Sequence, residues 1–281
     1  MRRSALATCT LAAALIAPMP AAPAAAAGPG QQPPPFPVGA PADYQLGGAY
    51  AGRDLGDVRH GAVIVRDRTD PPADPSGKRG GFDVCYLNAF QTQPISLRWW
   101  RRTHPDLLLR EDGRLVRDPG WRAEVLLDTR RREARVRIAR IVGRWARGCA
   151  RDGYEAVELD NLDSFGRSRG LLQRVDNLAL ARMVVRRVHA GGLAVAQKNL
   201  AGLRPAAVRR IGFDFAIAEE CQRYDECAAY ARAHGRRIVE IEYRRSDFEA
   251  ACARHGGRWA VLLRDRALRP AGEPGHVREM C

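Results

Sequence analysis

The sequence predicts an α/β fold, a (β/α)8 barrel or TIM barrel, built as a single domain. Three observations support this prediction: eight short apolar runs, amphipathic segments between the later runs, and the length of the chain behind its N-terminal leader. Strands that alternate with helices form parallel βαβ units, and eight units in about 240 residues match the usual size of this barrel. A doubly wound sheet would need a Gly-rich phosphate loop, and the sequence contains neither GxGxxG nor a Walker motif.

The expected strands are the eight apolar runs, most of which end in a polar residue. They are YQLGG (44–48), AVIVRD (62–67), DVCYLN (83–88), AVELDN (156–161), AVAQKN (194–199), DFAIAEE (214–220), IVEIEY (238–243) and AVLLRD (260–265).

The expected helices precede the later strands. Segments 131–153 and 174–192 carry apolar residues at helical spacing, and Gly191-Gly192 would stop the second. Segment 224–235 precedes the seventh run. Segment 246–257 precedes the eighth, with Ser246 or Asp247 as the expected N-cap.

The first 27 residues have the features of a secretory signal peptide. Two arginines precede a short apolar run that ends in small residues, and two prolines make the run unsuitable as a membrane anchor. Export by either the general or the twin-arginine route remains open. Residues 28–43 are rich in Pro and Gly and predict a linker, so we expect the barrel domain to span 44–281 of a secreted, extracellular protein.

Six cysteines remain after removal of the leader, and an even number in a secreted chain predicts disulfides that staple the fold. Six cysteines allow 15 pairings. Cys221 and Cys227 are close in sequence and are expected to pair; Cys252 with Cys281 and Cys85 with Cys149 are then a guess by elimination. The sequence has no CxxC and its histidines are scattered, so we expect no metal site and no cofactor.

The chain is strongly basic, with a formal charge of +14, or +12 without Arg2 and Arg3. Basicity can indicate a nucleic-acid partner. Here nearly all of it is arginine, since the only lysines are Lys78 and Lys198, and no RNA-binding signature accompanies it. We attribute the charge to coding bias and expect no nucleic-acid partner.

The active site of such a barrel lies at the C-terminal ends of its strands. Asp160 and Glu219 stand out, because the fourth and sixth strands sit two apart and their carboxylates can face each other across the mouth. Some polar ends could simply cap the next helix, for which Asp163 and Ser164 are suited. The side chains at the strand ends are Asp67, Asn88, Asp160, Asn161, Gln197, Lys198, Asn199, Glu219, Glu220, Glu242, Tyr243, Arg264 and Asp265.

Two carboxylates at a barrel mouth favour glycoside hydrolysis, in which one is the general acid and the other a nucleophile or base. There is no GxSxG of an esterase and no HExxH. A metal-dependent phosphodiester hydrolase that uses Asp160 and Asp163 remains an alternative. The aromatic residues that could stack on sugar rings are Trp99, Trp100, Tyr86, Tyr224 and Tyr243. For Trp99 and Trp100, ordinary packing is an equal alternative.

Several motifs, in order, resemble glycoside hydrolase family 114. They are YQLGGAY, VIVRDRTDPP, CYLNAFQTQP, EVLLDTR, AVELDNLDSF, LAVAQKN, FDFAIAEECQRYDEC and IEY, which together cover nearly all of 44–265. The resemblance implies a secreted endo-α-1,4-polygalactosaminidase with a TIM-barrel domain. The Asp of the family's DN.D motif falls on Asp160 and the Glu of its E.C motif on Glu219, with Glu220 as the alternative.

We therefore expect Asp160 to be the nucleophile or transition-state stabiliser and Glu219 the general acid/base. Val157 and Leu159 should pack, while Glu158 should point to the same face as Asp160, deeper in the barrel, and need a partner there. Lys198 or an arginine could serve. The remaining expected substrate-binding residues are Asp67, Asn88, Asn161, Asp163, Lys198, Glu220, Tyr224, Glu242 and Tyr243.

The expected partner is a polysaccharide, bound by a monomer with no membrane attachment once the leader is cut. A galactosamine polymer with free amines is cationic, so either the mouth is locally acidic, or the substrate is N-acetylated or another polymer. A carbohydrate-binding barrel without catalysis and a basic cell-wall or nucleic-acid binding protein are the other hypotheses. The distance between the carboxylates would decide between retention and inversion.

Overall fold

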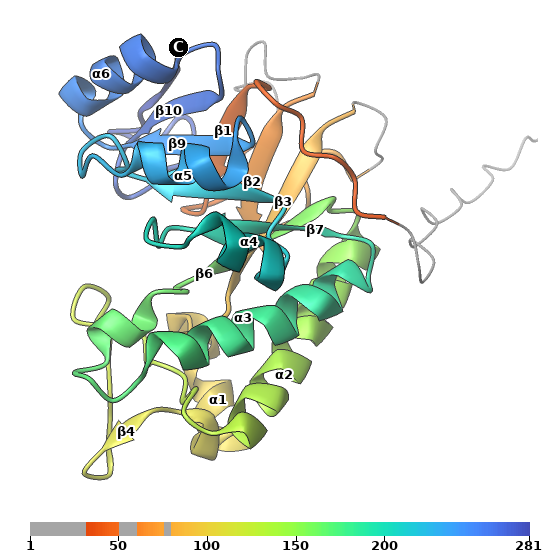
Figure 1. The fold of residues 1–281 in the computed structure, drawn as a ribbon, viewed down its shortest axis with the longest axis vertical. Helices are drawn as coiled ribbons and strands as arrows, with labels where there is room; N and C mark the ends of the chain where they lie inside the picture. The colour runs from red at the N-terminus through yellow and green to blue at the C-terminus, as the bar shows by residue number, and fades with distance from the viewer. Residues whose placement is uncertain (1–31, 51–60, 76–79) are drawn as a thin grey trace, which may run out of the picture.

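The computed structural model describes residues 32–50, 61–75 and 80–281, so the expected signal peptide lies outside the described residues. Nine strands form one sheet in the order β1-β2-β3-β6-β7-β8-β9-β10-β11 (Figure 1). The first eight are parallel to their neighbours, and β11 is antiparallel to β10. The strands are β1 (Ala42–Gln45), β2 (Val63–Asp67), β3 (Phe82–Asn88), β6 (Ala156–Asp160), β7 (Ala194–Lys198), β8 (Phe215–Glu219), β9 (Ile238–Glu242), β10 (Ala260–Arg264) and β11 (Arg278–Met280).

Seven of the eight parallel strands fall within one residue of the predicted run at their start, and β1 overlaps the first run only at Tyr44 and Gln45, because it begins two residues earlier. The order and direction of the strands confirm the barrel prediction. The connections between β3 and β10 carry helices, whereas the connection from β10 to β11 and the described parts of the loops after β1 and β2 contain none. The helices are α1 (Leu97–Thr103), α2 (Arg132–Asp152), α3 (Arg174–His189), α4 (Pro205–Ile211), α5 (Cys227–His234) and α6 (Arg245–His255). A short hairpin of β4 (Arg110–Glu111) and β5 (Arg114–Leu115) precedes α2.

Side chains rather than a backbone ladder close the barrel between its first and last parallel strands. Arg264 of β10 donates to Asp43 Oδ1 at 2.9 Å and to the carbonyl oxygen of Tyr44, both on β1. Arg278 of β11 donates to the carbonyl oxygen of Ala42 at 3.1 Å. The sheet is therefore nearly closed, and β11, which the sequence pattern did not predict, covers the edge of β10.

The folded domain begins before Tyr44, within the stretch expected to be a linker. Phe36 is buried, stacks on Phe215 with ring centroids 4.6 Å apart, and meets Phe82 edge-on at 5.7 Å. Phe82 and Phe215 begin β3 and β8. Phe36 therefore fills the N-terminal end of the barrel, because a large apolar ring gains more from burial than from exposure.

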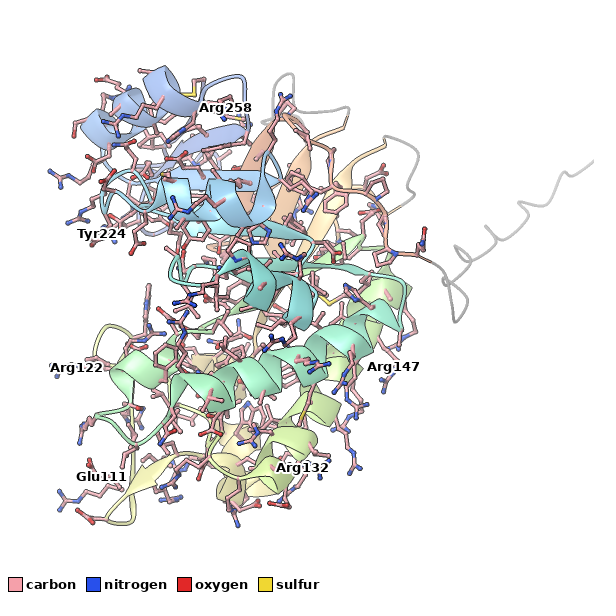
Figure 2. All side chains as sticks on the ribbon, in the orientation of Figure 1. Glu111, Arg122, Arg132, Arg147, Tyr224 and Arg258 are labelled. Atoms are coloured by element: carbon pink, nitrogen blue, oxygen red, sulfur yellow. A yellow bond between two sulfur atoms is a disulfide. The ribbon has the colours of Figure 1, made fainter. Side chains whose placement is uncertain are left out.

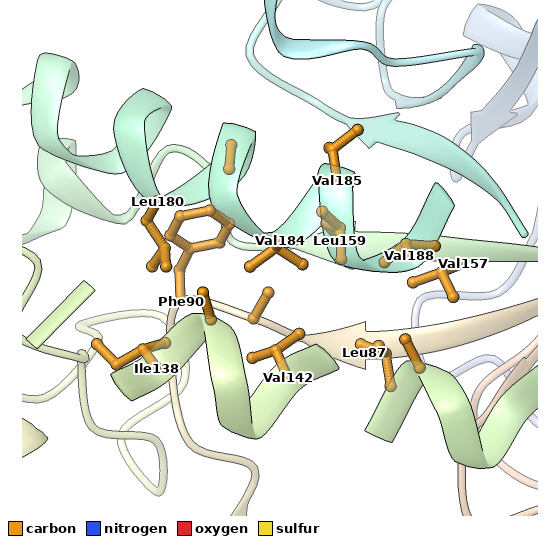
Figure 3. Packing of buried hydrophobic residues seen from close by; sticks show 14 of the residues in the cluster. Leu87, Phe90, Ile138, Val142, Val157, Leu159, Leu180, Val184, Val185 and Val188 are labelled. Atoms are coloured by element: carbon orange, nitrogen blue, oxygen red, sulfur yellow. The ribbon is translucent and has the colours of Figure 1, made fainter. Parts of the chain in front are cut away.

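Helices α2 and α3 pack on the outer face of β3 and β6 (Figure 3). Val157 and Leu159 are fully buried there, as predicted. A Cβ at Gly143 of α2 would lie 2.9 Å from the side chain of Arg187 on α3, so glycine permits the close approach of the two helices. Gly153, with φ of 99°, ends α2 in the left-handed conformation that glycine adopts at low cost.

Two helix details differ from the sequence predictions. α6 begins at Arg245 with Arg244 at the N-cap position and no side-chain cap, so neither Ser246 nor Asp247 is the cap. Asp247 lies instead in the first turn, where a negative charge is favourable. α4 was not predicted, although Pro205 at its start is a typical first helical residue.

Three disulfides confirm the expected pairings. Cys85–Cys149 ties β3 to α2, Cys221–Cys227 closes the loop between β8 and α5, and Cys252–Cys281 anchors the C-terminal residue to α6. Each such link typically stabilises a fold by about 2–4 kcal/mol, mainly by restricting the unfolded chain.

The outer surface carries much of the arginine. Figure 2 shows Arg132 and Arg147 of α2 and Arg258 after α6 pointing outward, and all three are exposed. Within the described part of the chain, no helix is both long and apolar enough to cross a bilayer.

Candidate active site

Strand alternation brings a set of charged side chains to the inside of the barrel. On β6, Ala156, Glu158 and Asp160 face inward, because successive side chains of a strand point to opposite faces. Lys198 and Glu219 end β7 and β8 with the same orientation. The three charged strand ends therefore meet at the C-terminal mouth.

A cavity of about 660 Å³ opens at this mouth. Among the described residues, its lining holds more acidic than basic side chains, so the mouth is locally acidic although the chain carries a formal charge of +14. The acidic members are Asp67, Asp118, Glu124, Asp160, Asp163 and Glu219, and the basic members are Arg167, Lys198 and Arg266.

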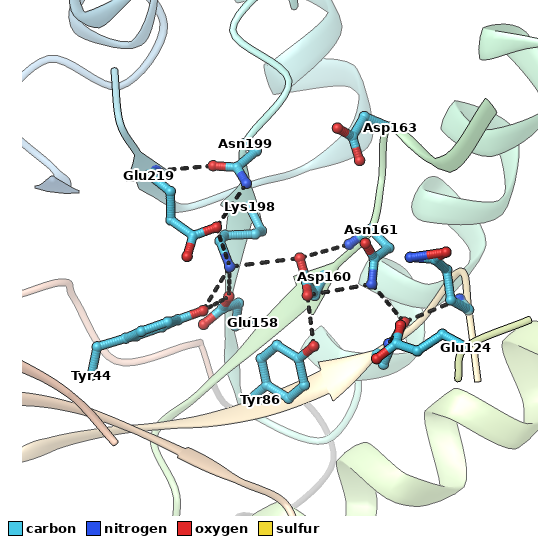
Figure 4. Close-up of polar contacts among 12 residues, drawn as sticks. Tyr44, Tyr86, Glu124, Glu158, Asp160, Asn161, Asp163, Lys198, Asn199 and Glu219 are labelled. Carbon is cyan, nitrogen blue, oxygen red and sulfur yellow. Dashed lines mark hydrogen bonds and ion pairs between the residues drawn. The ribbon is translucent and has the colours of Figure 1, made fainter. Parts of the chain in front are cut away.

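Lys198 lies between the two candidate catalytic carboxylates (Figure 4). Its Nζ is 3.6 Å from Asp160 Oδ1 and 3.3 Å from Glu219 Oε2. By the triangle inequality these two distances place Asp160 Oδ1 and Glu219 Oε2 within 6.9 Å of each other. The predicted pairing with Glu158 is confirmed, since Lys198 Nζ donates to Glu158 Oε1 at 2.8 Å.

Phenol groups fix the orientation of both carboxylates. Tyr86 donates to Asp160 Oδ2 at 2.6 Å, and Tyr243 donates to Glu219 Oε1. Asn199 Nδ2 donates to Glu219 Oε2 at 3.1 Å. Each carboxylate thus has donors on the protein side and an open side toward the cavity.

Burial and charge together set the protonation of Glu158 and Lys198, which lie beneath the open sides of the two carboxylates. Burial raises the pKa of Glu158 to about 7, and Lys198 opposes the rise. Burial lowers the pKa of Lys198, but Asp160, Glu158 and Glu219 outweigh it and raise the pKa well above the usual value. Lys198 therefore stays cationic and reduces the repulsion between the carboxylates around it.

A second network links Asp160 to the far wall of the cavity. Asn161 Nδ2 donates to Asn88 Oδ1 at 3.0 Å, and Asn88 Nδ2 donates to Glu124 Oε2 at 2.9 Å. Burial, followed by the charges of Asp160 and Asp118, raises the pKa of Glu124 to about 7. Asn88 is buried below the lining rather than in it.

The structure places seven of the eleven expected site residues in the lining and four outside it, of which Asn88 lies directly below the lining and the other three lie away from it. The seven are Asp67, Asp160, Asn161, Asp163, Lys198, Glu219 and Tyr243. Glu242 differs because it alternates with Ile241 and Tyr243 and so faces the outer helices, where it accepts from the backbone N–H of Gln222.

Glu220 and Tyr224 also lie outside the lining. Glu220, with φ of 55°, turns away after β8 and pairs with Arg223 and Arg266. Tyr224 is 58% exposed in the following loop, where Arg223 covers its ring. The geometry favours Glu219 over Glu220 as the member of the pair that faces Asp160.

The aromatic residues divide between packing and the cavity. Trp100 is fully buried against Trp145, and Trp99 packs on both, so this pair belongs to the packing of α1. Tyr86 and Tyr243 line the cavity. Trp121, which was not among the candidates, also lines it.

Sequence reasoning missed several lining residues, chiefly those in connections. Tyr44 could have been found from its inward position on β1, since it shares a face with Ala42. The other missed residues with polar, charged or aromatic side chains lie in connections without periodicity: Gln93, Asp118, Trp121, Glu124, Arg167 and Arg266.

A metal site finds no support in the donor sets of the described residues. Cys221, Cys227 and Glu240 lie within 4.8 Å of one another, but the two sulfurs form a disulfide and offer no thiolate. Asp163, one of the carboxylates considered for metal-dependent phosphodiester hydrolysis, pairs with Arg167 at 2.9 Å.

Comparisons with known proteins agree on the fold. The model of glycoside-hydrolase family GH114 matches residues 20–281. Aspergillus fumigatus Ega3, solved in complex with galactosamine, is 21% identical with a TM-score of 0.65, over 88% of this chain and 96% of that one. The glycoside hydrolase domain of PelA from Pseudomonas aeruginosa is 16% identical with a TM-score of 0.59, over 83% and 97%. No curated protein matches the sequence.

Proposed function

The chain belongs to glycoside-hydrolase family GH114 and is a glycoside hydrolase, and from this premise we propose that it is a secreted, endo-acting enzyme that cleaves α-1,4-linked galactosamine-containing polysaccharide. The observation that carries the proposal is the pair Asp160 and Glu219, held on either side of Lys198 at the cavity floor. The galactosamine bound to the structurally similar Ega3 supports the substrate class.

In this mechanism Glu219 protonates the glycosidic oxygen as the bond from C1 to that oxygen breaks. A carboxylate oxygen of Asp160 then bonds to C1. In the second half, Glu219 takes a proton from water, the water oxygen attacks C1, and Asp160 is released as a carboxylate. Tyr86 and Lys198 stabilise the negative charge on Asp160 before and after its covalent bond.

The distances around Lys198 are compatible with retention of configuration. Retaining enzymes hold the two carboxyl groups about 5–5.5 Å apart, and inverting enzymes about 6.5–9.5 Å. The limit of 6.9 Å applies to one oxygen of each carboxylate, Asp160 Oδ1 and Glu219 Oε2, and it accommodates the retaining spacing, on which the proposed two-step mechanism rests.

The acidic lining supports a cationic polymer as substrate, although the chain as a whole is basic. A polymer with free amines is attracted to the carboxylates around the cavity, whereas the outer arginines repel it elsewhere. The three disulfides support secretion, because such bonds persist in oxidising surroundings.

The test is the release of soluble oligosaccharides from partly deacetylated α-1,4-galactosaminoglycan. Asp160→Asn and Glu219→Gln should each abolish release while the proteins remain folded. Glu220→Gln is the matched control, because it removes a neighbouring carboxylate outside the cavity. A folded parent that releases nothing over a range of pH and acetylation would contradict the substrate, and binding without release would favour a non-catalytic carbohydrate-binding barrel.

A further inference from the structure

The loop between β5 and α2 carries a large aromatic side chain into the cavity. Trp121 lines the cavity and is still 67% exposed. Single exposed apolar residues are ordinary on a surface, but an open indole inside an acidic cavity is typical of a ligand site. The neighbouring residue Arg122 points outward, on the same side of the molecule as Tyr224 (Figure 2).

Hydrogen bonds hold this loop in one conformation. Asp118 is buried, and its Oδ1 accepts from the backbone N–H groups of Gly120 at 2.8 Å and Trp121 at 3.2 Å. Its Oδ2 accepts from Arg167 at 2.6 Å. The N–H of Glu124 donates to the carbonyl oxygen of Trp121 at 2.8 Å. The indole is therefore presented by a fixed backbone, which reduces the ordering cost of binding.

Glu124 brings a carboxylate close to the reacting centre. It is joined to Asp160 through Asn88 and Asn161: Asn88 donates to Glu124 at 2.9 Å, Asn161 Nδ2 donates to Asn88 at 3.0 Å, and the backbone N–H of Asn161 donates to Asp160 Oδ1 at 2.8 Å. A sugar whose C1 meets Asp160 carries its C2 substituent on the adjacent carbon. Groups around Asp160 therefore face that substituent, as with the 2-hydroxyl contacts of other glycoside hydrolases.

Resting on the proposed function, we propose that the loop 117–124 forms a subsite for a cationic amino sugar, in which Glu124 pairs with the 2-ammonium group and Trp121 covers a face of a sugar ring. Arg167, which bonds to Asp118 of this loop, does not compete with the ammonium for Glu124, because Asp118 and Asp163 hold its guanidinium. An acetamido group would leave the half-buried carboxylate of Glu124 without a cation, so the subsite disfavours N-acetylated units.

The test compares fully deacetylated and fully N-acetylated α-1,4-galactosamine oligomers of equal length. Glu124→Gln keeps the shape and the acceptor for Asn88 but removes the charge. Trp121→Phe keeps an aromatic face, whereas Trp121→Leu keeps apolar volume without one. Glu111→Gln is the control for charge, because Glu111 pairs with Arg169 outside the cavity.

We expect Glu124→Gln to raise the KM for deacetylated oligomers roughly tenfold and to reduce the preference of the parent for them. Trp121→Leu should raise the KM for both oligomers by about fivefold to tenfold, and Trp121→Phe and Glu111→Gln should change it less than twofold. Unchanged KM and preference in Glu124→Gln, or equal effects of Phe and Leu at position 121, would overturn the proposal.

Binding separates failure of this inference from failure of the proposed function. If the folded parent cleaves neither oligomer, the proposed function fails, and calorimetry with the deacetylated oligomer still tests the subsite. Binding by the parent that is weakened in Glu124→Gln and Trp121→Leu would support it. Equal binding by all variants, or no binding by the parent, would overturn it.

Discussion

The ammonium of Lys198 lies 2.8 Å from the carboxylate of Glu158, and both side chains are almost completely buried at the centre of the barrel. Tyr44 completes this layer, since its hydroxyl donates to Glu158 at 2.7 Å and accepts from Lys198 at 2.6 Å. The layer supports Asp160 and Glu219 from below. It therefore connects the interior of the fold to the chemistry at its mouth.

Replacing Lys198 should inactivate the enzyme and destabilise the fold. Lys198→Met leaves three carboxylates without their shared cation, and loss of one partner of a buried pair typically costs about 3–5 kcal/mol. We expect kcat to fall by at least about a hundredfold and the acid limb of the pH profile to move to higher pH.

The double variant Lys198→Met with Glu158→Gln separates the two effects. Removing the buried carboxylate as well should recover much of the stability, measured by chemical denaturation, without recovering activity. If activity returned together with stability, Lys198 would be a structural residue only.

Removing the hydroxyl of Tyr86 should lower kcat more than it changes KM. Tyr86→Phe deletes the donor to Asp160 Oδ2, which stabilises the ionised carboxylate. The expected loss is about tenfold to a hundredfold in kcat, measured by steady-state kinetics on a defined oligomer. Tyr224→Phe is the matched control, since that ring lies outside the cavity.

The alternation of side chains between the two faces of each strand explains how much of the site could be predicted. Asp160, Lys198 and Glu219 are the last residues of their strands, and each lies at a position that faces inward, so a correct strand register places them together. The same alternation places Glu242 on the outer face of β9, because it lies one residue before the inward-facing Tyr243. The positions of Trp121 and Glu124 depend on hydrogen bonds made by Asp118 and Asn88, which no periodic pattern records.

Stability should fall as the pH rises from about 4.5 to about 8, in part because of two buried carboxyl groups on β9. Burial raises the pKa of Glu240 to about 7 and that of Glu242 to about 8, from an ordinary value of 4.5. Above pH 4.5 the unfolded chain loses these protons, whereas the folded chain keeps them until pH 7 to 8. The unfolded state then binds fewer protons, so the free energy of unfolding falls in this window.

Glu242→Gln should reduce the dependence of the free energy of unfolding on pH. Near Glu242 lie Glu240, Asp247 and Glu220, whose negative charges oppose its ionisation. The variant should melt at a higher temperature than the parent at pH 9 and at nearly the same temperature at pH 4. A parent and variant with parallel melting curves over this range would contradict the assignment.

Removal of a charge at the seam, where Arg264 of β10 meets Asp43 of β1, should lower the stability of the fold far more than removal of a charge from a surface ion pair. Arg264 and Asp43 are both fully buried, and their oxygen and nitrogen atoms lie 2.9 Å apart. Arg264→Met would leave the buried carboxylate of Asp43 with Arg278, 3.5 Å away, as its remaining cation, and would break the bond to the carbonyl oxygen of Tyr44, at a cost of about 3–5 kcal/mol. Arg245→Met removes the half-exposed pair with Glu279 and should cost less than about 1 kcal/mol. Urea denaturation of the two variants measures the difference.

The same two variants should also differ in activity. Because Tyr44 belongs to the layer beneath the catalytic pair, a folded Arg264→Met protein should lose activity, whereas Arg245→Met should keep it. Equal losses of activity in the two variants would mean that the seam does not position Tyr44.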